Sequence, residues 1–328
     1  MNARTRYVVI ASLLVLAVGL GTGLVAYYVG LPGPQRYPGP AELAFIPRAA
    51  AIVAYANVRE VMASELRQRL RRAMPAQENG RREFEDATGV NVETDIDRVV
   101  ACFDPQDAGS DASSGLVLAR GVFNEAKIEG LMRDHGARVD AYKDKRIVVG
   151  ESGPQHNNPA LAFVEPGLIA IGDERLLRAA IDLEKAGDNV TTNADVMRLV
   201  RALDNANAWA VGRFDALQST AKLPPAVARQ VPAITWFSIS GRVTDGFDGV
   251  IRAETRDQDA AKNLRDVVQG FIALAKLQAG GNSKLQSLIQ SLDVGGDDKT
   301  VALTFSMPGA AIDSLGALAQ PHPPQPTH

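Results

Sequence analysis

Ser219 and Lys222 have the S-x-x-K spacing of serine acyl-enzymes, in which the nucleophilic serine is activated by a neighbouring base. Such an enzyme also needs an oxyanion site and a second polar pair. The sequence contains neither S-D-N nor K-T-G, because Lys299 and Thr300 are followed by valine. A four-residue pattern this loose arises by chance in a chain of 328 residues. We therefore expect a helix end beside a proline-rich turn here, and no catalytic residue.

Glu93, Asp95 and Asp97 alternate along the chain in a pattern similar to that of an acidic cation loop. A calcium loop of the helix-loop-helix kind needs glycine after the third acid and glutamate at the twelfth position. Those positions hold Arg98 and Asp104. The pattern therefore favours a solvated approach to the next strand, with Asp95 or Thr94 capping the turn, and no metal site.

The remaining side chains that suit metals or nucleophilic chemistry are isolated. His135 and His156 lack the i, i+4 spacing and the cysteine partners of a zinc site. Cys102, the single cysteine, lies in an apolar run where a thiol behaves as a small hydrophobic group. It has no cationic or basic neighbour in sequence that would activate it. We expect no cofactor and no enzyme activity.

One basic concentration stands out, on the polar face of the first expected helix. It consists of Arg67, Arg69, Arg71 and Arg72. These arginines are candidate contacts for anionic lipid or for a partner close to the membrane. The alternative is a solvated helix face whose charge is balanced by the acidic residues between positions 78 and 86.

Composition restricts the class of protein. Hydrophobic residues make up 46% of the chain and charged residues 22%, which is typical of a folded chain. The net charge of -3 and the aromatic content of 5% do not suit a nucleic-acid-binding protein. Arg4, Arg6 and Arg36 are the only charged residues before position 37, so the remainder carries a net charge of -6.

Residues 7–31 are predicted to form a transmembrane anchor, because no charged residue interrupts them and most are apolar. Arg4 and Arg6 precede them, which favours a cytoplasmic N-terminus at residues 1–6 and a body outside the cytoplasm. The expected location is therefore the inner (cytoplasmic) membrane, crossed once. A cleaved signal peptide is the alternative, since residues 17–19 are small enough for a signal peptidase.

Gly19 and Gly23 lie four residues apart in this segment, the spacing that lets two transmembrane helices approach closely. They are candidate packing positions for a homodimer formed through the anchor. Glycine is also common in such segments without any packing role.

Proline-rich stretches flank the body. Residues 32–45 contain the prolines and glycines of a semi-extended spacer. Residues 319–328 are expected to be a disordered, proline-rich tail.

Between these ends, strand and helix signals occur in an order that repeats, which predicts a first α+β repeat at 46–204 and a second at 205–318. The first repeat is expected to contain strands at 51–57, 96–103, 115–121, 147–149, 160–164 and 168–171, with helices after Arg59, Asn124, Glu174 and Thr192. The second is expected to begin with a strand at 208 that aligns with the first, so that Ala208 matches Ile52 and Gly212 matches Ala56. Further strands are expected at 234–242, 249–254 and 301–305, with a long helix between the last two.

Pro166-Gly167 and Asp245-Gly246 are hairpin turns by type, which implies antiparallel or mixed sheets. Each helix shows one apolar stripe, so we expect helices packed on one face of the sheets. The predicted fold is thus an α+β body of two similar halves behind a transmembrane helix.

Three passages resemble a group of bacterial proteins classed only as a domain of unknown function. They are residues 46–57, 88–98 and 207–213. The resemblance implies a single-pass, membrane-anchored, exported protein with a repeated α+β body, and it transfers no catalytic residue.

These observations together predict a membrane-anchored, non-enzymatic binding or scaffolding protein of the bacterial envelope. Its expected partners are the membrane, through residues 7–31, and an unknown envelope protein. One alternative is a carrier of an apolar ligand or lipid, held between sheet and helices. The other is an exported serine hydrolase acting on envelope material.

Overall fold

The computed structural model describes residues 39–73, 78–104, 114–150, 159–203, 206–216, 234–279, 286 and 289–309. The expected anchor at 7–31, most of the spacer and the tail at 319–328 lie outside these ranges. In the ranges that are described, no helix combines the length and the apolar character needed to cross a membrane.

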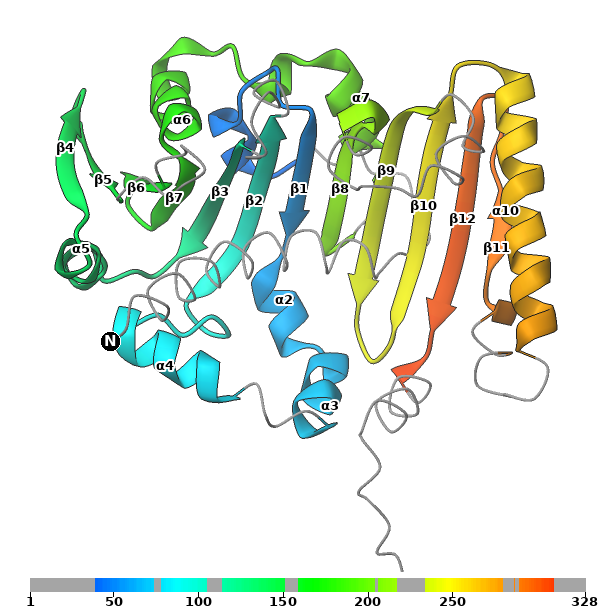
Figure 1. The fold of residues 1–328 in the computed structure, drawn as a ribbon, viewed down its shortest axis with the longest axis horizontal. Helices are drawn as coiled ribbons and strands as arrows, with labels where there is room; N and C mark the ends of the chain where they lie inside the picture. Colours follow the sequence, from blue (N-terminus) through cyan, green and yellow to red (C-terminus); the bar gives the residue numbers. More distant parts are fainter. Residues whose placement is uncertain are drawn as a thin grey trace, which may run out of the picture.

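One open sheet of twelve strands forms the body (Figure 1). From one edge to the other the strands are β11 (Asp293–Gly295), β12 (Thr300–Met307), β10 (Phe247–Thr255), β9 (Ile234–Val243), β8 (Ala208–Arg213), β1 (Ile52–Ala56), β2 (Ile96–Asp104), β3 (Ser114–Gly121), β7 (Leu168–Asp173), β6 (Pro159–Glu165), β5 (Lys145–Val149) and β4 (Arg138–Tyr142). Every described pairing is antiparallel, so the α+β expectation is confirmed and the sheet is antiparallel rather than mixed.

Helices pack on both faces of the sheet. One face carries η2 (Ala41–Phe45), α6 (Glu174–Ala186), η5 (Val190–Thr192) and α7 (Ala194–Arg201). The other carries α2 (Val58–Ala63), α4 (Glu78–Thr88), α5 (Glu125–Asp134) and α10 (Gln258–Gln278), and α3 (Glu65–Ala73) continues from α2. Figure 1 shows α6 and α7 above the strands, α2 to α4 below them and α10 along the edge formed by β11 and β12.

The expectation of helices on one face was wrong, and the strand sequences contain the reason. Val99 and Val100 are adjacent on β2, yet one lies in the core beneath α2 and α5 and the other in the core beneath α6. Val117 and Leu118 on β3 divide in the same way. Because neighbouring strand residues point to opposite faces, a continuous apolar run requires cover on both.

Side-chain caps fix the helix starts. Asn57 accepts a hydrogen bond from the backbone N–H of Glu60, and Asn124 accepts one from Lys127. Asp257 caps α10 in the same manner. The cap of α7 is Asn193, not Thr192, which instead ends η5.

The helix expected after Arg59 is divided in two by Ser64. This residue is extended (φ -65°, ψ 149°), so α2 ends before it and α3 begins after it. Its hydroxyl donates to the carbonyl of Val61 at 2.6 Å and accepts from the N–H of Arg67 at 3.1 Å. Serine competes for backbone groups in this way, which explains the break despite the continuous apolar spacing.

Two further boundaries differ from the expected ones. Residues 41–45 were placed in the spacer, whereas they form η2 and bury Leu43 and Phe45 in the core. β4 was not expected, because its side chains are mostly exposed or half-buried and give no apolar alternation.

β1 and β8 pair at the centre of the sheet, and their register is symmetric. Ala54 lies opposite Ala210, with Tyr55 opposite Trp209 on one side. Outward from this central pair, β1 is followed by β2 and β3, and β8 is followed by β9 and β10. Trp209 is 1% exposed and stacks on Tyr55 with ring centroids 5.5 Å apart.

Replacing Gly212 with alanine tests the tightness of this central pair. A Cβ at position 212 would lie 2.6 Å from the carbonyl oxygen of Ala51, the residue before β1, so the backbone must move. We expect Gly212→Ala to lower the free energy of unfolding by about 1–3 kcal/mol, the usual cost of overpacking. Denaturant unfolding followed by tryptophan fluorescence measures it, since Trp209 lies in this pair.

Gly270→Ala in α10 is the matched control. No atom lies within 4 Å of a Cβ built there, and alanine favours the helix, so stability should stay unchanged or rise by up to about 1 kcal/mol. Equal midpoints for Gly212→Ala and the parent chain would show that the pair tolerates the extra methyl group.

Candidate functional site

Several residues singled out from the sequence lie outside the described ranges. They are Gly19, Gly23, His156, Ser219 and Lys222. Arg71 and Arg72 lie within α3, but their side chains are not described.

The structure brings the basic and acidic clusters together. Arg67 donates to Glu93 at 2.8 Å, and the two side chains are only 29% and 19% exposed. Arg81 of α4 approaches the same carboxylate at 4.0 Å. Glu93 therefore holds α3 and α4 next to the loop that precedes β2. This pairing was not anticipated, because 26 residues separate Arg67 from Glu93.

The other two acidic residues of the alternating trio have separate structural partners. Asp95 accepts hydrogen bonds at 2.8 Å from the backbone N–H of Asn91 and from the hydroxyl of Thr94, so it caps the turn as expected. Asp97 pairs with Arg59 of α2. Among the described residues, no group of three metal-binding side chains occurs.

Arg69 is the other arginine of the cluster with a described side chain. It lies 3.8 Å from Glu65, one helical turn earlier, and is 36% exposed. An exposed pair of this kind contributes little to stability.

Cys102 and His135 are structural. Cys102 is 5% exposed, and burial raises the pKa of its thiol to about 12. His135 ends α5, with its Nδ1 atom 2.6 Å from the carbonyl oxygen of Leu131.

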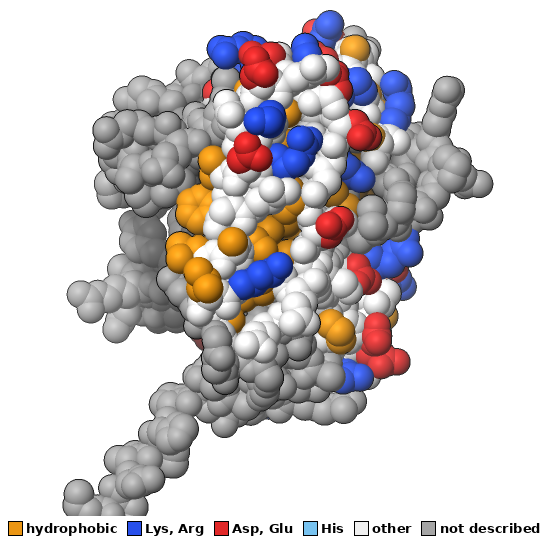
Figure 2. Space-filling model, turned by 90° about the vertical axis from the view of Figure 1, so that its right-hand side faces the viewer, with side chains coloured by type: hydrophobic (Ala, Val, Ile, Leu, Met, Phe, Trp, Pro, Cys, Tyr) orange, Lys and Arg blue, Asp and Glu red, His pale blue; other side chains and the backbone are white. Residues whose placement is uncertain are grey.

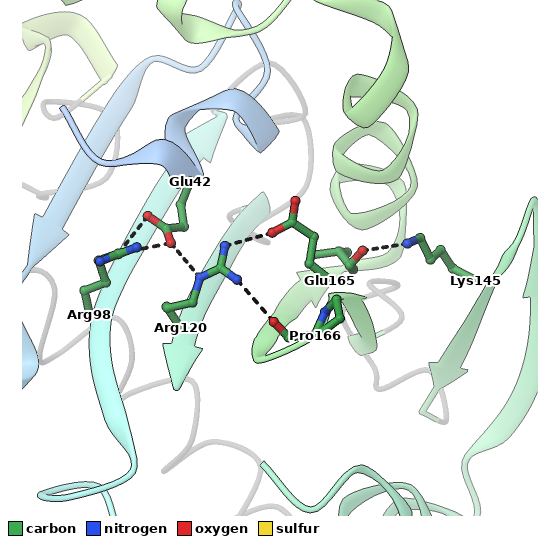
Figure 3. A network of polar contacts seen from close by, with 7 residues as sticks. Glu42, Arg98, Arg120, Lys145, Glu165 and Pro166 are labelled. Atoms are coloured by element: carbon green, nitrogen blue, oxygen red, sulfur yellow. Dashed lines mark hydrogen bonds and ion pairs between the residues drawn. The ribbon is translucent and has the colours of Figure 1, made fainter. Parts of the chain in front are cut away.

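A buried ion network centred on Glu42 attaches η2 to the sheet (Figure 3). Arg98 of β2 donates to both carboxylate oxygens of Glu42 at 3.0 Å, and Arg120 of β3 donates at 2.8 Å. Arg120 also donates to Glu165 at 2.9 Å and to the carbonyl of Pro166 at 3.3 Å. One carboxylate that is 1% exposed thereby joins two strands and the start of the body.

The charge state of Glu42 follows from two opposing effects. Burial alone would raise the pKa of Glu42, but hydrogen bonds from Arg120, from the backbone and from Arg98 outweigh it and hold the pKa below its ordinary value. Glu42 is therefore ionised at neutral pH, and with both arginines engaged it serves as a clamp rather than as an acid or base. Its sequence signal was a lone acid in the apolar stretch 41–45.

A depression of about 350 Å³ lies at the β9–β12 end of the sheet. Its lining is polar or charged apart from Phe305, and comprises Arg242, Asp248, Ser291, Asp293, Thr304, Phe305 and Ser306. Ser306 donates to Asp248 across the β10–β12 pair.

Three of the five exposed large hydrophobic side chains among the described residues lie on α10, and the other two, Val122 and Val139, lie elsewhere. Phe271, Leu274 and Leu277 are 55%, 50% and 79% exposed, and Val267, half-buried, precedes them at helical spacing. We call these four residues the α10 stripe. Figure 2 faces this side of the molecule and shows hydrophobic side chains gathered there beside lysine and arginine.

The sheet contacts of α10 leave this stripe free of the core. Ala261 and Leu264 pack against Val301 of β12, and Arg265 donates to the carbonyl of Gly296 at 3.1 Å on the opposite flank. At 100° per residue, Arg265 and Lys276 lie on one flank of the helix and the stripe on the other. Helical spacing alone does not distinguish the exposed stripe from the buried face, because Val267 and Phe271 follow Leu264, which is buried, at intervals of three and four residues.

Comparisons with known proteins add little. A scan of family models and a search of curated proteins give no match. One solved structure, described as "Structure of crystal form III of TP0453", is similar at a TM-score of 0.49 and 8% identity, covering 86% of this chain and 100% of that chain. The candidate surfaces therefore rest on the geometry of this chain.

Glu42→Gln tests the clamp. Arg98 and Arg120 would lose their charged partner while remaining 39% and 22% exposed, so we expect about 2–3 kcal/mol of destabilisation at neutral pH, below the usual cost for a fully buried pair. Since the folded pKa of Glu42 is lowered, its contribution is present above the unfolded value of about 4.3 and is lost as pH falls through the folded value. The difference from the parent should therefore shrink in acid.

Denaturant unfolding at a series of pH values measures this difference. Glu165→Gln is the control, because Glu165 is 37% exposed and its loss should cost about 1 kcal/mol or less. Equal costs for the two substitutions would contradict the clamp.

The thiol of Cys102 should be unreactive in the folded protein. With its pKa raised to about 12 and its side chain buried, almost no accessible thiolate exists at mildly alkaline pH. A chromogenic disulfide reagent should modify it only in concentrated guanidinium chloride. A cysteine introduced at exposed Gln269 provides the comparison, and equal rates for the two thiols in the folded state would show that Cys102 is accessible.

Proposed function

We propose that this chain is a single-pass protein of the inner (cytoplasmic) membrane, anchored through residues 7–31, whose body outside the cytoplasm is a non-enzymatic binding or scaffolding module of the bacterial envelope. Residues 1–6 stay in the cytoplasm. The proposal includes membership in the bacterial group of unknown function that residues 46–57, 88–98 and 207–213 resemble.

The observation that supports the non-enzymatic part of this proposal is that the side chains capable of chemistry are paired or buried within the fold. Arg67 and Glu93 neutralise each other, Asp97 pairs with Arg59, and Cys102 is buried with a raised pKa. Each of these groups stabilises the fold, and none faces another in an arrangement that transfers protons or attacks a substrate. Such a body supports binding better than catalysis. Nothing in the described ranges favours the apolar-ligand carrier or the serine hydrolase.

We also propose that the body consists of two related halves, 46–204 and 205–318. The central register supports this idea, because the sequence alignment that equates Ile52 with Ala208 also equates Ala54 with Ala210, and these two face each other. Two copies of one strand that pair about a twofold axis must place an equivalent pair at the centre. The outward order of the next two strands on each side agrees with it.

The partner surface that we propose is the basic C-terminal part of α3. Arg69, Arg71 and Arg72 belong to it, whereas Arg67 is engaged with Glu93. An envelope protein with an acidic surface fits this chemistry. A homodimer through Gly19 and Gly23 remains part of the proposal.

Photo-crosslinking in intact membranes tests the function. A photoreactive phenylalanine at position 71 or 72 should give a discrete adduct with an envelope protein, whereas the same group at Arg256, 73% exposed and on a different part of the body, should not. Resistance of the chain to alkaline extraction tests the anchor separately. An extractable chain would overturn the anchor, and the absence of an adduct at both arginine positions would overturn the partner surface.

A further inference from the structure

We infer that the α10 stripe docks on the surface of a bilayer that contains anionic lipid, the same bilayer in which the chain is anchored. The inference rests on the proposed anchor and adds a second membrane contact, made by the body itself. Its basis is the chemistry, the size and the surroundings of the stripe.

The chemistry of the stripe suits a lipid interface. An interfacial helix inserts large apolar side chains a short way below the headgroups and keeps its cations near them. Phe271, Leu274 and Leu277 supply the apolar side chains, and each is at least half exposed. From residue 267 to residue 278 the helix contains one lysine, Lys276, and no acidic residue. Anionic headgroups therefore meet no repelling carboxylate on this part of α10.

The size of the stripe argues against a second copy or another protein. Its ten-residue rise gives a length of about 15 Å, and one helix face about 10 Å wide yields an area on the order of 150 Å². A stable protein interface buries about 800 Å² on each partner. A bilayer surface has no such minimum when the protein is already held next to it.

The proposed anchor and the short segment that follows it would hold the body next to the bilayer. Residues 32–39 connect the anchor to the first described residue and reach about 28 Å at most when fully extended. A tether this short raises the effective concentration of the body at the bilayer to the millimolar range, so that a contact too weak to hold a free protein becomes occupied. Three exposed side chains are then sufficient.

The single buried cysteine makes a direct test practical. Leu274→Cys is labelled with a nitroxide in the full-length chain, because Cys102 is buried with a pKa near 12 and does not compete. The protein is reconstituted in vesicles of phosphatidylcholine with or without phosphatidylglycerol. We expect the label to gain accessibility to oxygen and lose accessibility to a water-soluble nickel chelate when phosphatidylglycerol is present.

Gln269→Cys is the matched control, exposed on the opposite flank of the same helix, and its label should stay in water. A charge at Leu277 supplies the second variant. Leu277→Asp should return the label at position 274 to water, whereas Gln269→Asp, with the same charge, should not. Since Leu277 is 79% exposed, its replacement leaves the fold intact.

Vesicle flotation tests the proposed anchor separately from the proposed docking of the α10 stripe. A chain that fails to float with vesicles would overturn the anchor and the docking together. A chain that floats while the label at 274 remains in water would overturn the docking alone. Dipolar broadening between labels at 274 on separate molecules, if it persists when Gly19 and Gly23 are both replaced with leucine, would assign the stripe to a second copy and also overturn it.

Discussion

The antiparallel pairing of β1 with β8 is the interaction on which the rest of the body depends. These two short strands are the only link between the two sides of the sheet in the described strand order, and five residue pairs make the contact. Hydrogen bonds extend it at both ends, from the N–H of Asn57 to the carbonyl of Asn207 at 2.7 Å and from Arg213 to Ala51 at 2.9 Å. With alanine at the middle of each strand, the centre of the sheet has little side-chain volume on one face. The large side chains of Tyr55 and Trp209 fill the other.

Contacts outside the sheet reinforce this central pair. Asn207, 5% exposed, donates to the carbonyl of Val243 and accepts from its N–H, both at 3.0 Å, so the end of β9 is held to the start of β8. At the same end of the sheet, the N–H of Leu66 donates to the carbonyl of Thr244 in the β9–β10 turn at 3.0 Å. The break at Ser64 allows this contact, because it redirects α3 away from α2 and toward the hairpin. A straight helix would have kept the expected apolar spacing and lost the link.

Much of this architecture was predictable from local sequence signals. Strand alternation, the Asn124 cap and the turn at Gly167, which has φ +70°, are properties of a few neighbouring residues, and they predicted the elements correctly. The division of the core between two faces was predictable in principle from adjacent valines such as Val99 and Val100, but the single apolar stripes of the helices pointed the other way. The Glu42 network was not predictable, because 56 and 78 residues separate Glu42 from Arg98 and Arg120. Partners at such separations are chosen by the fold, and local patterns contain no information about them.

Local sequence patterns are also insufficient to show whether a cluster of charged residues forms a functional surface. Arg67 is part of a basic run in sequence, yet at 29% exposure it neutralises Glu93 instead of presenting charge to a partner. An exposed apolar residue gives the opposite case, since Phe271 fits the buried pattern of its helix in sequence and lies 55% exposed in the structure. An arginine that pairs with a carboxylate of its own chain, as Arg67 does, is weak support for an external ligand. A large apolar side chain that is exposed to water on a helix cannot be stabilised in this way, because burying it requires a second surface. For this chain, the side chains most in need of an outside partner are therefore the apolar ones of α10, and a bilayer already tethered to the body is the surface that can meet that need with so small an area.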